Sequence, residues 1–346
     1  MHCACVQLSH ASFLRFLPRM YEIDKITIVP LRSTESSLLA PGETIELGFG
    51  VSVEDCQKLL ASADRYIWSH KGDPDDEKEI GSWGSCLVHR YTAPSGTGEP
   101  EEYSIKLLPY VLGHLRLLNP HRDSIDDWIQ LEKTSSGQYS GFRCSKAPGR
   151  PNRFLCDCEN LCWGIDRKQI DELKTLMPWI VKFKDNWEHY YPLWLALFFG
   201  EQSYIGGQNF RIIFLFKVMA LEALFSTESS YGLAALKRRI PKLLGNGLDL
   251  HEDYQVDFWP LPKLELTTDL IRDICRLRNK VAHSDRIPDD WQKNIIRKGL
   301  NGEEISYAGE LLEAAGSILR LSWLKILRSG LQDIFSDKAK MQAYLQ

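Results

Sequence analysis

The sequence predicts an α+β domain at the N-terminus followed by an all-α helical bundle. In the first part of the chain, up to about residue 160, short strand-like runs alternate with turns rich in Gly and Pro. From residue 166 onward, apolar residues recur at helical spacing, with little strand pattern between them. A chain of 346 residues is also too long for one ordinary core, so we expect two domains, residues 1–162 and 163–346.

Two strands and one helix are expected in the N-terminal domain. Segments 25–31 and 44–53 carry the apolar and β-branched residues of strands, and Gly and Pro bound them. Segment 53–69 is expected to be a helix because its apolar residues are spaced for one helical face. The residues of that face are Cys56, Leu59, Leu60 and Ala63.

Five helices are expected in the C-terminal domain. Pro178 is expected to close the first of them, and Gly245 and Gly247 follow the third as stop signals. The apolar stripes of these helices would pack against one another as antiparallel neighbours. The expected helices span 166–177, 209–226, 232–244, 267–284 and 306–335.

The composition is that of a soluble globular protein, with 44% hydrophobic and 25% charged residues and a net charge of -4. This weak acidity excludes a protein that binds nucleic acid over its whole surface, although it allows a local basic groove. Neither of the most apolar stretches, 190–200 and 212–225, approaches the roughly 20 apolar residues that a membrane span needs. Nine cysteines without a signal peptide indicate a reducing compartment, so we expect a cytoplasmic protein without membrane contact.

Segment 267–285 carries the residues best suited to chemistry. One face has apolar residues at helical spacing and predicts a buried stripe: Leu270, Ile274, Leu277 and Val281. The opposite face offers charge for binding phosphate beside an imidazole that can move protons near neutral pH. The residues of this second row are Arg272, Arg276, Asn279 and His283.

The spacing Arg278-Asn279-x-x-x-His283 resembles the Arg-x(4–6)-His motif of HEPN domains, in which a polar residue usually follows the arginine. Segment 216–225 (FKVMALEALF) is similar to the LEALF-type helix of the Apea-like HEPN branch, with Glu222 at the acidic position. Lys237, Arg238 and Arg239 lie in the segment where that branch has its next helix. The resemblance covers about residues 165–335, the C-terminal half only, and implies a HEPN-like helical bundle there.

This resemblance implies a metal-independent endoribonuclease that uses no cofactor. The 2′-hydroxyl of the RNA would attack the adjacent phosphorus and leave a 2′,3′-cyclic phosphate and a 5′-hydroxyl. His283 would transfer protons, and Arg278 would stabilise the charge on the phosphate. Asn279 would orient a side chain or the scissile group, Glu222 would support Arg278 through an ion pair, and Arg276 is a further supporting candidate.

The same resemblance implies the biological setting. RNA would be the substrate, and two chains would pair through their HEPN helices as a homodimer. A bacterial toxin or antiviral-defence effector is the implied role, with an antitoxin or regulatory partner as a possible restraint. The N-terminal domain, which the resemblance does not cover, would serve sensing or target recognition.

The bare motif is weakly specific, because Arg65 and His70, and also Arg116 and His121, have the same spacing. The first copy lacks a polar second residue, and the second has a proline just before its histidine, which is unfavourable inside a helix. Neither copy follows a LEALF-like segment. The copy at Arg278 therefore remains the candidate.

The helix itself raises a geometric difficulty. On an ideal helix Arg278 and His283 are about 140° apart, whereas Arg276 and His283 differ by about 20°. Either the helix ends or distorts near Ala282, or two copies of the motif meet across a dimer and each contributes part of one site.

The residues alone are also compatible with two alternative functions. A non-catalytic module could bind RNA or nucleotides with the arginine row, or the bundle could serve only to assemble a complex. In either case His283 would be a favourable charge at a helix C-terminus and Arg278 a surface ion-pair partner. Glu222 would then pair with Lys217 or Arg238 for packing only.

Four cysteines within 19 residues raise the question of a zinc site. Thiolates hold Zn²⁺ in tetrahedral structural sites, usually as two closely spaced pairs. The spacing here includes a C-x-C that is strained for one metal, so free thiols in a β-rich segment are the alternative reading. The cysteines are Cys144, Cys156, Cys158 and Cys162.

Overall fold

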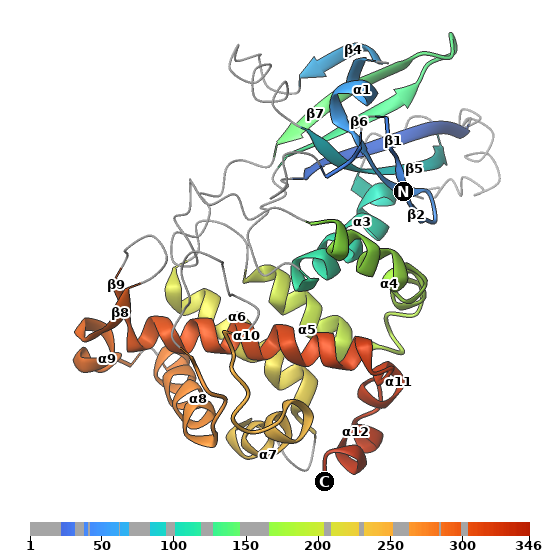
Figure 1. The fold of residues 1–346 in the computed structure, drawn as a ribbon. Helices are drawn as coiled ribbons and strands as arrows, with labels where there is room; N and C mark the ends of the chain where they lie inside the picture. The colour runs from blue at the N-terminus through green and yellow to red at the C-terminus, as the bar shows by residue number, and fades with distance from the viewer. Residues whose placement is uncertain are drawn as a thin grey trace, which may run out of the picture.

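The computed structural model describes a sheet-containing N-terminal part and a mostly helical C-terminal part (Figure 1). The expected order along the chain, a part with a sheet followed by a helical part, is therefore present. The expected boundary at residues 162 and 163 lies outside the described residues. The described residues are 22–31, 38–40, 42–61, 63–68, 84–94, 101–118, 127–145, 166–203, 209–227, 232–251, 263–283, 285–298 and 304–346.

The sheet has seven strands in the order β2-β3-β5-β1-β6-β7-β4. Strand β1 lies at its centre and pairs antiparallel with β5 and β6, while β4 joins β7 in parallel at one edge. The strand expected at 25–31 is confirmed as the larger part of β1. The strands are β1 (Glu22–Leu31), β2 (Ile45–Gly48), β3 (Val51–Asp55), β4 (Ala63–Trp68), β5 (Ser85–Pro94), β6 (Asp127–Lys133) and β7 (Tyr139–Ser145).

Two expectations for the N-terminal part are wrong. Segment 44–53 is not one strand, because the chain reverses between β2 and β3 through Gly48, Phe49 and Gly50, which all have positive φ. Segment 53–69 is not one helix: it contains the end of β3, the short helix α1 (Cys56–Ala61) and strand β4. Pairing of β4 with β7, which lies far away in the sequence, overrides the helical spacing of this segment.

Two helices cover one face of the sheet, α3 (Glu101–Leu118) and α4 (Arg167–Asp185). Their apolar residues form one core cluster with buried residues of β1, β2, β3 and β5. Helix α4 continues through Pro178, so the expected end at 177 is wrong. Ile180 and Phe183 beyond the proline are fully buried, and this burial offsets the hydrogen bond that proline cannot donate.

The C-terminal part packs around α10, the long central helix in Figure 1. The helices expected at 209–226 and 232–244 are confirmed, and Asn209 caps the first by accepting a hydrogen bond from the backbone of Ile212. The described elements are α5 (Tyr191–Gln202), α6 (Phe210–Phe225), α7 (Gly232–Leu244), α8 (Thr268–Ala282), α9 (Asp289–Lys293), β8 (Ile295–Lys298), β9 (Glu304–Ser306), α10 (Tyr307–Arg328), α11 (Gln332–Phe335) and α12 (Lys338–Tyr344).

Three features of this part differ from the expectation. The hairpin of β8 and β9 interrupts an otherwise helical region, so the part is not all-α. The helix expected at 306–335 is two helices, because the chain turns at Gly330, which has a φ of 67°. Helix α5 was not expected, since an apolar run without helical periodicity does not distinguish a buried helix from other core segments.

Candidate active site

Helix α8 holds the motif residues and is fixed by its apolar face. Thr267 caps its N-terminus, accepting a hydrogen bond of 3.1 Å from the backbone N–H of Leu270. The helix therefore begins at Thr268, directly after its cap. The whole expected stripe is buried, which turns the polar side of α8 outward: Leu270, Ile274, Leu277 and Val281.

Glu222 and Arg278 meet across the seam between α6 and α8. The Nη2 of Arg278 lies 3.2 Å from the Oε2 of Glu222, so the ion pair expected between them is present. The Nη1 of the same guanidinium donates to the Oδ1 of Asn279 at 3.3 Å. Two side chains therefore hold the guanidinium, and its plane is oriented relative to both helices.

The pKa of the Cys275 thiol is affected by several charged side chains near this seam. Burial and the carboxylate of Glu222 raise the pKa of Cys275 to about 12, while Arg278 and Lys237 act in the opposite direction. Lys237 belongs to α7, which packs against both α6 and α8. Charged groups from three helices therefore act on this thiol, and the side chain of Lys237 is half-buried.

His283 lies exposed at the end of α8. The helix ends at Ala282, and the backbone of His283 leaves helical geometry with φ -91° and ψ 10°. Its N–H still donates to the carbonyl of Asn279 at 3.0 Å. The expected end of the helix near Ala282 is thus observed, so helical periodicity no longer sets the direction of the imidazole.

Arg272 and Arg276 lie apart from this seam. The carboxylate of Asp273 accepts from Arg276 at 3.3 Å and lies 3.5 Å from the Nε of Arg272, which also pairs with Asp269. The hydroxyl of Tyr307 donates to Asp273 at 2.8 Å. Among the described residues, Arg276 forms its ion pair with Asp273 and none with the Glu222–Arg278 pair, so the structure does not bring it there as a support.

Sequence reasoning did not consider Arg211, which lies near the end of α8. Its Nη1 donates to the backbone carbonyl of Asp285 at 3.2 Å, two residues after His283. Helices α6 and α8 therefore run antiparallel, with Arg211 opposite Asp285 and Glu222 opposite Arg278. No local sequence signal marks Arg211, because only the packing of α6 on α8 places it there.

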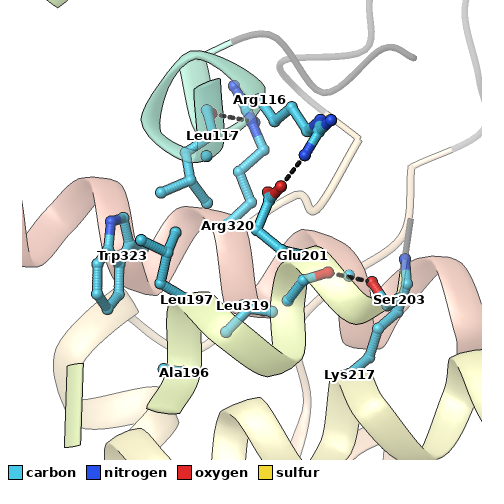
Figure 2. Close-up of a pocket in the computed structure, with 13 residues that line it drawn as sticks. Arg116, Leu117, Ala196, Leu197, Glu201, Ser203, Lys217, Leu319, Arg320 and Trp323 are labelled. Carbon is cyan, nitrogen blue, oxygen red and sulfur yellow. Dashed lines mark hydrogen bonds and ion pairs between the residues drawn. The ribbon is translucent and has the colours of Figure 1, made fainter. Parts of the chain in front are cut away.

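Of the two rival motif copies, only Arg116 has a described side chain. Arg116 on α3 forms an ion pair with Glu201 on α5, at the junction of the two parts of the chain (Figure 2). His121, His70 and three of the cysteines considered for zinc lie outside the described residues: Cys156, Cys158 and Cys162. The side chains of Arg65 and of Cys144, which belongs to β7, are not described either. Within the described ranges, no group of three or more metal-binding side chains is present.

A small pocket occupies this junction between α3, α5, α6 and α10 (Figure 2). Its volume of about 20 Å³ admits about one water molecule. The Nε of Arg320 donates to the carbonyl of Leu117 at 2.8 Å and so ties α10 to α3. Lys217 on α6 also lines the pocket, and burial lowers its pKa to about 8.

A buried charge cluster lies beside this pocket. Arg297 on β8 pairs with Glu310 at 3.2 Å and also with Glu313, both on α10. Burial raises the pKa of Glu313, whereas Arg297 and Lys217 lower it. The cluster joins the β8–β9 hairpin to the central helix, so it has a clear structural role.

None of the described helices combines the length and the apolar character that crossing a membrane requires. The chain matches no family model, no curated protein and no solved structure. The candidate site is therefore defined by the contacts of this chain alone: Glu222, Arg278, Asn279 and His283.

Proposed function

We propose that the protein is a metal-independent endoribonuclease of the HEPN type, with its active site at the α6–α8 seam. One observation carries the proposal: the ion pair between Glu222 and Arg278 lies five residues before an exposed His283 at the end of α8. In this proposal the guanidinium of Arg278 binds phosphate and the nearby imidazole of His283 transfers protons.

The proposed reaction needs only these groups. The 2′-oxygen of the RNA attacks the adjacent phosphorus, and the bond from phosphorus to the 5′-oxygen breaks. His283 accepts the proton of the 2′-hydroxyl or donates one to the leaving 5′-oxygen. Arg278 binds the phosphate oxygens as their charge develops, while Glu222 and Asn279 hold the guanidinium in place.

A homodimer would supply a second imidazole. One histidine in one chain serves as either base or acid in a single turnover, and two motifs across a two-fold axis would provide both. By the resemblance, this enzyme acts in the cytoplasm as a toxin or antiviral-defence effector in a bacterium, restrained by an antitoxin or regulatory partner. The N-terminal part would sense the trigger or recognise the target.

The test is RNA cleavage in EDTA by the parent protein and by His283→Ala, with end-group analysis of the products. We expect the parent to leave cyclic phosphate ends and the variant to lose about 100-fold or more in rate. His189→Ala is the matched control, since His189 is also exposed and lies in the turn before α5. Intact RNA with the parent across several substrates would reject the nuclease.

A specific observation favours assembly as the second candidate function. An aromatic stripe runs along α5, where the rings of Tyr191 and Trp194 stack at 5.8 Å and those of Trp194 and Phe198 at 5.3 Å. Tyr191 and Phe198 are more than 40% exposed. Exposed apolar patches of this kind mark protein interfaces.

The two candidates give different results in solution. For an assembly module, Tyr191→Ser together with Phe198→Ser would shift the sedimentation coefficient toward a smaller species, and RNA would be neither bound nor cut. Salt-dependent RNA binding without cleavage would instead indicate a non-catalytic RNA-binding module.

A further inference from the structure

Three cations from three different helices line the seam that contains the candidate site. Arg278 comes from α8 and pairs with Glu222. Arg211 comes from the first turn of α6 and reaches the carbonyl of Asp285. Lys237 comes from α7 and lies close enough to Cys275 to influence its thiol.

These cations follow one another along α8. Helix α7 packs against α8, and the charge of Lys237 acts on the thiol of Cys275. Arg278 follows on α8, and Arg211 contacts Asp285 just beyond His283. From position 275 to the end of the helix at Ala282, seven steps of 1.5 Å span about 10 Å, and Asp285 follows beyond that end. The scissile position between Arg278 and His283 thus has one cation on each side, at a spacing that suits a few nucleotides.

We propose that Lys237 and Arg211 bind the backbone phosphates of single-stranded RNA on either side of the scissile phosphate. This inference rests on the proposed function, because it extends the same site. Single-stranded RNA is the fitting substrate, since a 2′-hydroxyl reaches the line of attack only when the linkage leaves the regular A-form helix. Flexible single-stranded RNA also allows its phosphates to follow cations that come from separate helices.

The charges along the seam support this path of the RNA backbone, which runs from Lys237 past Arg278 to Arg211. Arg278 pairs with the carboxylate of Glu222, whereas the guanidinium of Arg211 contacts the neutral backbone carbonyl of Asp285. Arg272 and Arg276, by contrast, share the carboxylates of Asp269 and Asp273 and are thereby compensated. The binding surface is therefore built from α6, α7 and α8 together and not from the arginine row of α8.

The experiment measures binding of a short labelled oligouridylate to the full-length His283→Ala chain, which leaves the RNA uncut. In that background, Lys237→Ala and Arg211→Gln are compared with the unchanged residues over a range of salt concentrations. Glutamine at 211 removes the charge and keeps a polar side chain on α6. Arg276→Gln and Arg238→Ala are the controls, because Arg276 pairs with Asp273 and Arg238 is exposed on α7.

Each removed phosphate contact should lower the slope of log K against log salt by about 0.7 for a single strand. We therefore expect this reduction for Lys237→Ala and Arg211→Gln and an unchanged slope for both controls. An unchanged slope in the two test variants, or an equal reduction in the controls, would overturn the path.

The failure of the path and that of the nuclease give different results. If the parent cleaves RNA but the slopes do not respond to Lys237 and Arg211, the path is wrong and the nuclease stands. If the slopes respond but the parent never cleaves, the path stands and the protein is an RNA-binding module. If the His283→Ala chain binds no RNA, the path is rejected whatever the parent does.

Discussion

Glu222 on α6 and Arg278 on α8 are joined by an ion pair of 3.2 Å that bridges two helices at the surface. Their side chains are 23% and 33% exposed, so each is partly accessible to a ligand. A pair in such a position contributes only about 0–1 kcal/mol to stability. The main consequence of the contact is therefore the orientation of the guanidinium.

This relationship predicts a loss of activity without a loss of fold in Glu222→Gln. The amide keeps the volume of the side chain but removes the charge that holds Arg278. We expect kcat/KM for RNA cleavage to fall about ten- to a hundred-fold, because a displaced guanidinium no longer meets the phosphate. The melting temperature, measured alongside, should change by a few degrees at most. Retention of full activity would show that Glu222 does not position Arg278.

Arg278→Lys and Arg276→Lys make the same chemical change two residues apart on one helix. Lysine carries the charge but lacks the planar fork of arginine, so it cannot bind Glu222, Asn279 and a phosphate in the same geometry. We expect Arg278→Lys to lose about 100-fold in kcat and Arg276→Lys to keep nearly the parent rate. Cleavage kinetics of both variants decide the matter, and equal losses would contradict the assignment of roles.

Much of α8 could be predicted from the sequence because its apolar spacing and its end residues all lie within one short segment. The stripe of Leu270 and Ile274 follows helical periodicity, and Thr267 and Ala282 bound it in the structure. The pair of Glu222 and Arg278 was expected from a family resemblance and not from spacing. Periodicity alone does not say which two helices pack together.

The missed features depend on packing between segments far apart in the sequence. Arg211 reaches Asp285 only because α6 lies antiparallel to α8. Strand β4 forms because β7 pairs with it, although its segment has helical spacing. Pro178 fails to end α4 because the sheet and α3 bury the residues on both sides of it. In each case a distant contact outweighs a local preference.

Acid should destabilise the protein through His114 on α3. This imidazole is fully buried, and burial lowers its pKa to about 4, although its Nδ1 lies 2.6 Å from the carbonyl of Tyr110. From pH 6.5 down to about 4 the unfolded chain binds the proton and the folded chain does not, so stability falls as the pH falls. Urea denaturation at pH 7 and pH 5 should show a loss that is smaller in His114→Phe, whose ring suits the contacts with Phe183 and Trp323. An identical loss in both chains would exclude His114 as a source.

Lys217 predicts a pH dependence of the same sign in the alkaline range. Its pKa falls from 10.5 in the unfolded chain to about 8 in the folded one, chiefly through burial and despite the nearby charge of Glu313. Between these values the unfolded chain binds more protons, so stability rises with pH, by at most about 3 kcal/mol. Lys217→Met removes this contribution. The stability of the parent relative to the variant should therefore increase from pH 8 to pH 10, and a constant difference would contradict the prediction.

Gly316 on α10 provides the space that Lys217 occupies. A Cβ at this position would overlap the Nζ of Lys217, whereas a Cβ at Gly309 on the same helix would make only ordinary contacts. Gly309→Ala should therefore raise the free energy of unfolding by about 0.5–1 kcal/mol through helix propensity. Gly316→Ala should instead lower it by about 1–3 kcal/mol, since the buried ammonium has to move. In the Lys217→Met background this loss should shrink, because the flexible thioether gives way more easily. Denaturation of the single and double variants measures the coupling, and a coupling of zero would show that Gly316 and Lys217 do not share this space.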